Sequence, residues 1–160
     1  VAAILGIYLV DDGYKVAGIY TFGQPKFTNA AGAKAYAELP LLRVIYQNDV
    51  VATFPDKTKD KAQLFAHVGP AVNLFPGPYY SYVPANQALK ISQGSMGRFL
   101  TQVSVPDHKM KWYLQGLRDK LKGARRVGLK DRNQYIVRHK YGRGVDTVCP
   151  EMKHEFNRRH

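Results

Sequence analysis

Residues 41–49 read Leu-Leu-Arg-Val-Ile-Tyr-Gln-Asn-Asp, a mostly apolar run that ends in three polar residues. Apolar, β-branched and aromatic residues bounded by polar turn formers predict a strand over residues 41–46. A similar run over residues 15–22 is closed by Gly23-Gln24-Pro25 and predicts an earlier strand. Because both runs are mostly apolar on both faces, they suit a parallel sheet that helices cover on each side.

Helical segments alternate with these strands. Residues 1–10, which end before Asp11-Asp12-Gly13, predict a buried helix, and the Ala-rich residues 30–38 predict a short one. A third strand is expected within residues 66–75, followed by a loop rich in Pro, Tyr and Gly as far as Pro84. The spacing predicts a helix over residues 109–122, with one apolar side made by Met110, Tyr113, Leu114, Leu117 and Leu121. This alternation predicts an α/β fold.

The first apolar helix begins without the usual start signals. No Met, no Ser, Thr, Asp or Asn cap and no basic region of a secretory signal precedes Val1. Such a helix leaves its first amide donors without capping partners. We therefore expect that further chain belongs ahead of Val1.

Composition narrows the class of protein. The 160 residues, 45% of them apolar, suit one ordinary domain with a sizeable core, and no apolar run reaches the length of a membrane span. The single cysteine, Cys149, excludes an internal disulfide framework and a multi-cysteine zinc site. The sequence gives no spacing of metal ligands, so neither a metal nor another cofactor is expected.

Positive charge is concentrated late in the chain. Residues 109–160 hold 15 Lys and Arg against 5 Asp and Glu, a net charge of +10 out of the chain's +12. Helical periodicity ends at Gly123, so we expect a domain over residues 1–122 and a basic extension over residues 123–160. Such an extension suits attraction to an anionic partner or simple solvation.

Two residues have the position and chemistry of a catalytic pair. Asp49 follows the carboxyl end of a predicted buried strand, where ligands and reacting groups of open α/β sheets gather. His108 lies in a later loop, just before the helix that starts at Lys109. An acid followed by a histidine is the order of the last two members of a Ser-Asp-His triad. In such a triad the carboxylate orients the imidazole, and the imidazole accepts the serine proton.

Several blocks of this sequence resemble the class 3 (fungal-type) lipases. They are Thr21-Phe22-Gly23-Gln24-Pro25, the run from Arg43 through Asp49 to Pro55, His67-Val68-Gly69, and Asp107-His108 with Tyr113-Leu114. The opening residues 1–5 resemble the helix that follows the nucleophile in that family. The resemblance spans roughly residues 1–122. It implies an α/β-hydrolase fold, of which this chain carries the C-terminal half of the sheet. It also implies activity on acylglycerols or related esters, with Asp49 as the acid and His108 as the base.

The nucleophile of that family is not found in this sequence. It belongs to a Gly-x-Ser-x-Gly turn directly ahead of the first helix, and none of the four serines has a glycine two positions before it. Gly94-Ser95-Met96-Gly97 is the stretch most similar to that turn, but no predicted strand leads into it. The chain alone is therefore expected to be inactive, as part of a lipase whose serine lies elsewhere.

Other residues offer weaker alternatives. His67 is the fallback base if His108 is misplaced, although a strand histidine is more often structural. Cys149 with nearby His154 lacks the formed pocket that a thiolate nucleophile needs. The aromatic loop over residues 75–82 suits either acyl binding or packing onto the core.

Two functional classes follow from these observations. The first is an ester hydrolase acting on lipids. The second is a non-catalytic module whose basic end binds an anionic membrane or a nucleic acid, the latter without any recognisable zinc-knuckle, RNP or helix-turn-helix pattern.

Overall fold

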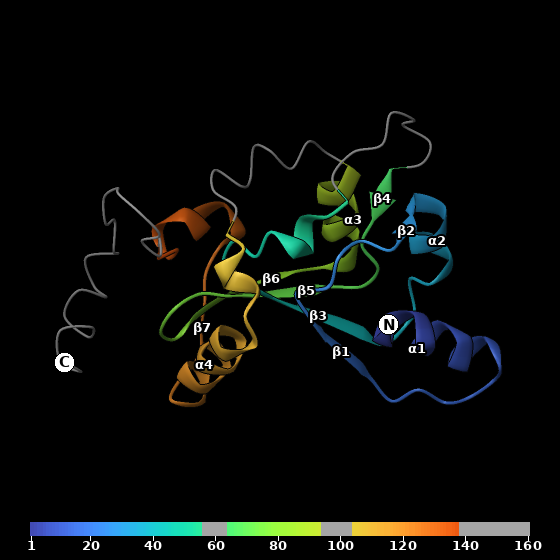
Figure 1. Cartoon of the computed structure of the whole chain (residues 1–160), viewed down its shortest axis with the longest axis horizontal. Coiled ribbons are helices and arrows are strands. Elements are labelled where there is room, and N and C mark those ends of the chain that lie inside the picture. The colour runs from blue at the N-terminus through green and yellow to red at the C-terminus, as the bar shows by residue number, and fades with distance from the viewer. Residues whose placement is uncertain (56–63, 94–103, 138–160) are drawn as a thin grey trace.

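A five-stranded mixed sheet forms the centre of the computed structural model, which describes residues 1–55, 64–93 and 104–137 (Figure 1). Its strands, in spatial order, are β1 (Ile19–Phe22), β3 (Leu41–Tyr46), β5 (Ala71–Leu74), β6 (Tyr79–Val83) and β7 (Arg125–Arg126). β1, β3 and β5 are mutually parallel, β6 is antiparallel to β5, and β7 is parallel to β6. The predicted α/β class is confirmed.

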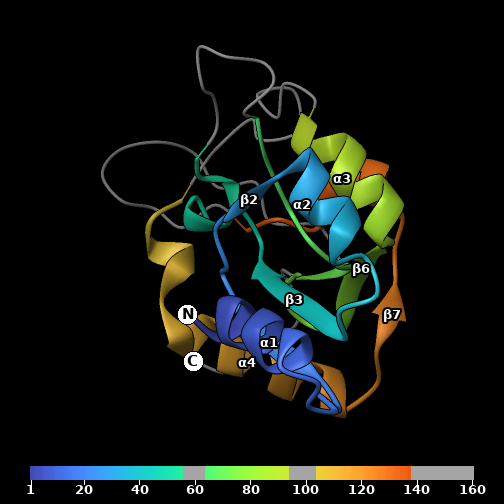
Figure 2. The same cartoon turned by 90° about the vertical axis from the view of Figure 1, so that its right-hand side faces the viewer.

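Helices lie on both sides of this sheet. α1 (Ala2–Asp11) and α4 (Met110–Leu121) lie on one side, and α2 (Ala30–Ala35) and α3 (Ala85–Gln93) lie on the other (Figure 2). Two short strands, β2 (Thr28–Asn29) and β4 (Phe65–Ala66), pair separately. Three 3₁₀ helices complete the described elements: η1 (Val51–Thr53), η4 (Pro106–His108) and η5 (Leu129–Gln134).

The alternation of side chains along the central strands builds a separate core on each face. Val44 and Tyr46 of β3 pack with Leu74 and with Tyr113 of α4. On the other face Ala71 and Val83 pack with Ala88 of α3. Successive strand residues point to opposite faces, so one short strand contributes to both cores. The parallel register aligns Phe22 with Val44 and Tyr46 with Leu74, which brings the carboxyl ends of β1, β3 and β5 to one edge.

The first helix forms where it was predicted but is not buried. Only two of its small residues, Ala3 and Gly6, are buried, and Gly6 lies against Ile19 of β1. Ile4, Leu5 and Tyr8 are 44%, 54% and 64% exposed. A smooth Ala/Gly face lets the helix approach the sheet closely, and this leaves the larger apolar side chains pointing outward.

The predicted apolar side of α4 is likewise mostly not buried. Tyr113 and Gly116 of α4 face the sheet, and Gly116 fits against Tyr46. The expected apolar side is instead largely exposed, in the form of Met110, Leu114, Leu117 and Leu121. Tyr113 is the only member of the predicted stripe that enters the core.

Two expectations for residues 64–93 were wrong. The region read as a loop contains β6, because Tyr79, Ser81 and Val83 point inward in strand alternation despite the neighbouring Pro and Gly. The expected strand over residues 66–75 is divided between β4 and β5, which belong to different sheets. Phe75 and Tyr79 of the aromatic segment pack against Tyr135, which agrees with a packing role.

The chain beyond Gly123 returns to the sheet before residue 137. β7 pairs with β6, the Arg132 side chain donates to Asn48 Oδ1 at 2.6 Å, and the Val137 amide donates to Gln47 Oε1 at 2.6 Å. The start of the expected extension therefore packs on the same body, and a domain boundary near residue 123 stays a prediction. Within the described ranges, no helix is long and apolar enough to cross a membrane.

Candidate active site

A sharp turn at the end of β3 presents Asp49. Gln47 adopts a left-handed conformation, with φ of 42°, and the Asp49 amide donates to Tyr46 O at 3.0 Å. η1 begins two residues later, and the Val51 amide donates to Asp49 Oδ1 at 2.9 Å. The turn thus carries the carboxylate out of the strand direction and fixes one of its oxygens. Asp49 is only 1% exposed.

The second carboxylate oxygen has two side-chain partners. His108 Nδ1 lies 2.9 Å from Asp49 Oδ2, and the Tyr113 hydroxyl of α4 donates a hydrogen bond to the same oxygen. Burial, reinforced by the bond to Asp49, raises the pKa of the Tyr113 hydroxyl, so this group stays protonated and acts as a donor. Because the carboxylate can only accept, Nδ1 carries the proton in the pair with His108.

The segment that carries His108 is fixed to the turn that carries Asp49. The Ser104 amide donates to Asn48 O at 2.9 Å, and Asp107 Oδ2 accepts a hydrogen bond from the Asn48 amide at 3.2 Å. η4 then turns the chain, with the His108 amide donating to Val105 O. These contacts join two segments that are 59 positions apart in the sequence.

Gly23 makes the close approach of the pair possible. It follows β1 with φ of +59°, and a Cβ atom at this position would lie 2.5 Å from Asp49 Oδ2 and 2.7 Å from His108 Nδ1. Both values are shorter than van der Waals contact, so only glycine fits between β1 and the pair. The Gly-Gln-Pro strand end indicated a turn at this residue but not its place beside Asp49 and His108.

The imidazole also faces an open hollow of about 440 Å³. The start of α1 from Val1 to Ile4, the end of β1, Phe27, Val51 and Met110 line this hollow together with His108. The side chain of His108 is 43% exposed, whereas that of Asp49 is 0% exposed. α1 begins after Val1 without a side-chain cap, so its first amides lie at the rim of the hollow without an intrahelical acceptor.

The arrangement has the chemistry of an acid–base pair. A buried carboxylate holds one imidazole nitrogen in a fixed tautomer, which leaves Nε2 as the nitrogen able to take or give a proton. Tyr113 and the Val51 amide hold the carboxylate in its orientation. Sequence reasoning placed Asp49 and His108 together and missed Tyr113, because a tyrosine in an apolar helical stripe is typical of a core residue.

The fallback base is placed elsewhere. His67 is buried, and its Nε2 donates to Ala52 O at 2.9 Å. Burial, with Arg43 and Lys26 nearby, lowers the pKa of His67 well below its usual value. It is a neutral, inward-facing group, as a structural histidine is expected to be.

The described serines have other hydrogen-bonding roles. Ser81 accepts from Asn73, Ser92 donates to Ala88 O, and Ser104 accepts from the Asp107 amide. Ser95, Cys149 and His154 lie outside the described residues. Within residues 1–55, 64–93 and 104–137, no group of three or more His, Cys, Asp or Glu residues could hold a metal ion.

Comparison with known proteins gives one match, to a family model. The family model for Lipase (class 3) matches residues 1–59, a range that includes Gly23 and Asp49 but not His108 or Tyr113. No curated protein and no solved structure matches the chain. Class 3 lipases are α/β-hydrolases, and the mostly parallel sheet with flanking helices described above is consistent with that fold. Residues 1–59 are thus similar to the class 3 lipases, an ester-hydrolase family.

Proposed function

We propose that Asp49 and His108 are the acid and base of a Ser-Asp-His triad that hydrolyses acylglycerols or related lipid esters. The observation that carries this proposal is the 2.9 Å contact between His108 Nδ1 and the buried Asp49 carboxylate at the carboxyl edge of the sheet. The carboxylate orients the imidazole and stabilises the imidazolium that forms when Nε2 accepts the serine proton.

The start of α1 is the expected position of the serine. In the class 3 lipase pattern the nucleophile lies directly ahead of this helix, and Val1 lines the same hollow as His108. A serine there would be within the reach of the imidazole. The amides at the start of α1 would also stabilise negative charge that develops on the carbonyl oxygen of the ester.

The lining of the hollow supports this substrate class. Phe22, Phe27 and Met110 provide apolar surface beside His108, which suits an acyl chain. By itself the 160-residue chain is proposed to be inactive, since its described serines are committed to structural hydrogen bonds. Loss of triad members lowers turnover by several powers of ten.

Ester hydrolysis with site-directed variants tests this proposal. In a protein with the Gly-x-Ser-x-Gly segment ahead of Val1, Asp49→Asn and His108→Ala should each lower kcat for p-nitrophenyl butyrate by roughly 10³-fold or more. Asp12→Asn, which changes an exposed acid at the end of α1, serves as the matched control and should have no effect. Full activity in either site variant would overturn the assignment.

The 160-residue chain provides a second test. We expect it to hydrolyse no ester and to remain unlabelled by a fluorophosphonate that reacts with activated serines. Labelling of Ser95 with turnover comparable to that of an intact lipase would show that the nucleophile lies inside the chain.

An anionic membrane is the second proposed partner. Arg125 and Arg126 of β7 are exposed, close in sequence to the exposed Lys122 at the end of α4. Basic residues near an anionic surface contribute about 1 kcal/mol each. Binding to phosphatidylglycerol vesicles should therefore weaken with salt and with Arg125→Gln. Equal binding to neutral phosphatidylcholine vesicles would refute this partner, and stronger binding to DNA would favour a nucleic acid.

A further inference from the structure

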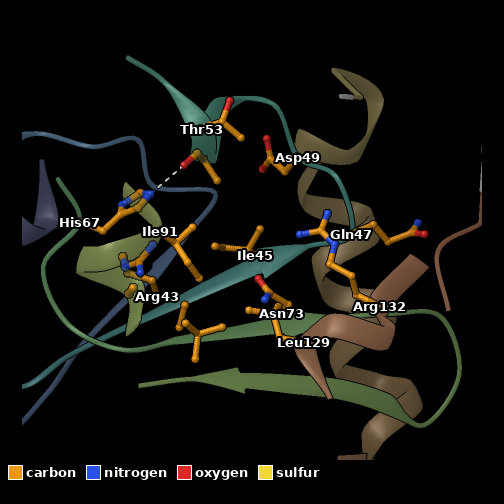
Figure 3. A pocket seen from close by; sticks show the side chains of 14 residues that line it. Arg43, Ile45, Gln47, Asp49, Thr53, His67, Asn73, Ile91, Leu129 and Arg132 are labelled. Carbon is orange, nitrogen blue, oxygen red and sulfur yellow. Dashed lines mark hydrogen bonds between the residues drawn. The ribbon is translucent and has the colours of Figure 1, made fainter. Parts of the chain in front are cut away.

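A second cavity lies on the α3 side of the sheet. It measures about 70 Å³, is partly open to solvent, and is lined by residues of β3, β5, β6, α3, η1 and η5. Figure 3 shows Arg43 and His67 at one end and Arg132 at the other, with Ile45 and Ile91 between them. A pocket with an apolar middle and an arginine at each end is unusual for a structural core.

Arg43 is the most deeply buried cationic side chain that lines this cavity. It comes from the middle of β3 and is only 2% exposed. Its Nε donates to Val68 O at 3.1 Å and its Nη2 to Gly69 O at 3.4 Å, which uses two of the five donors of a guanidinium. Both acceptors are neutral carbonyls, and burial lowers the pKa of Arg43 to about 9. Among the described residues no acid forms an ion pair with Arg43, so its charge lacks a counter-ion.

Further polar atoms around the cavity lack partners. Nδ1 of His67 and Nε of Arg132 are both buried without a hydrogen bond. Asp49 also lines the cavity, toward the Arg132 end, but His108, Tyr113 and the Val51 amide already occupy its carboxylate oxygens. Asp49 is therefore held by its partners in the candidate active site and does not neutralise Arg43.

We infer that this cavity binds a short-chain carboxylate, with Arg43 as the counter-charge of the carboxylate group. A space of about 70 Å³ exceeds the roughly 10–15 Å³ that one water needs, and it suits a ligand of a few heavy atoms rather than a long acyl chain. A guanidinium matches the two oxygens of a carboxylate, and Ile45 and Ile91 favour a methyl or methylene group. The inference does not depend on the proposed ester hydrolysis.

His67 should make the affinity for a carboxylate depend on pH. Nε2 carries a proton toward Ala52 O, so neutral Nδ1 is an acceptor and meets a carboxylate only with a proton taken up from solvent. Within the described part of the chain, the charged groups that face His67 are Arg43 from β3 and Lys26 from the loop after β1, both cationic. The anion would offset their repulsion of the proton. Affinity for acetate should therefore rise as pH falls from 8 to 6, and His67→Gln should remove this dependence.

Titration of the thermal unfolding midpoint of the whole chain tests the inference. Sodium acetate should raise the midpoint saturably, whereas sodium gluconate at equal ionic strength should not, because gluconate exceeds the cavity. Sodium chloride is the third arm, and an effect equal to that of acetate would overturn the carboxylate assignment. Arg43→Met should weaken acetate binding at least tenfold, and Arg118→Met, which removes an exposed charge, should leave it unchanged.

A second variant covers the case in which Arg43→Met does not fold. Ala88 of α3 is 3% exposed and lines the cavity, so Ala88→Val fills part of the space without touching a charge. The variant should fold and lose the response to acetate. An unchanged acetate response in Ala88→Val, or equal stabilisation by acetate and gluconate, would show that this cavity is not the binding site.

Discussion

Substitution of Gly23 by alanine tests how tightly the structure holds the Asp49–His108 pair. Two independent effects are expected. The left-handed conformation, with φ of +59°, disfavours any side chain, and an alanine there costs roughly 1 kcal/mol of folding free energy. The added Cβ would also lie 2.5 Å from Asp49 Oδ2 and 2.7 Å from His108 Nδ1, so one of these groups must move.

The second effect should be the larger. Separation of the two side chains removes a hydrogen bond to a charged group, which contributes about 1.5–3 kcal/mol. The two effects together predict that Gly23→Ala lowers the free energy of unfolding by roughly 2.5–4 kcal/mol. Gly13→Ala is the matched control, because Gly13 has φ of +83° but nothing within 4 Å of its would-be Cβ. The control should lose only about 1 kcal/mol.

Urea unfolding of the three proteins measures these differences. A proton NMR spectrum adds a local readout, since the His108 Nδ1 proton bound to Asp49 should give a downfield signal that is present in Gly13→Ala and absent in Gly23→Ala. If Gly23→Ala is no less stable than Gly13→Ala and retains that signal, the pair is not in contact as described.

Two further substitutions test a buried hydrogen bond on each face of the sheet, that of Tyr113 and that of His67. Tyr113→Phe removes a hydrogen-bond donor to the Asp49 carboxylate and should lower the free energy of unfolding by about 1.5–3 kcal/mol. The control Tyr20→Phe changes an exposed tyrosine and should stay within about 0.5 kcal/mol of the parent protein. Equal effects of the two substitutions in urea unfolding would contradict the hydrogen bond between Tyr113 and Asp49. His67 has a lowered pKa in the folded state, so below about pH 6.5 the unfolded chain takes up a proton that the folded chain does not, and stability falls with pH by up to about 1.4 kcal/mol per unit. His67→Gln retains a donor for Ala52 O and should show a smaller loss between pH 7 and pH 5.5, and an identical loss would locate the titration elsewhere.

The sequence predicted those helices and strands for which the local residue pattern and the tertiary packing favour the same structure. The run over residues 41–46 became β3 with the predicted bounds, because its side chains are covered on both faces. β6 was missed because Gly77 and Pro78 before it and Pro84 after it favour a loop by composition. Its strand character comes from pairing with β5, which no local pattern records.

The candidate active site also has parts that the sequence predicted and parts that it did not. Asp49 and His108 could be paired from their order and their resemblance to a known family, since both lie where loops leave the sheet edge. The supporting contacts could not be predicted. Tyr113 became a partner of Asp49 only because α4 packs on β3, and Asp107 became a partner of the Asn48 amide only because residues 104–108 run beside the turn. Arg43 gave no signal of its burial, since an arginine in a strand is ordinarily found at the surface.

β1 lies at the end of the described sheet and pairs with β3 alone. Its other side therefore offers unpaired backbone donors and acceptors next to the exposed rings of Tyr20 and Phe22, which are 67% and 37% exposed. Such a border is a template for an additional strand from any polypeptide that meets it. Concentrated solutions of the isolated chain should accordingly self-associate through intermolecular sheet extension, and a charged residue at position 20 should suppress this association.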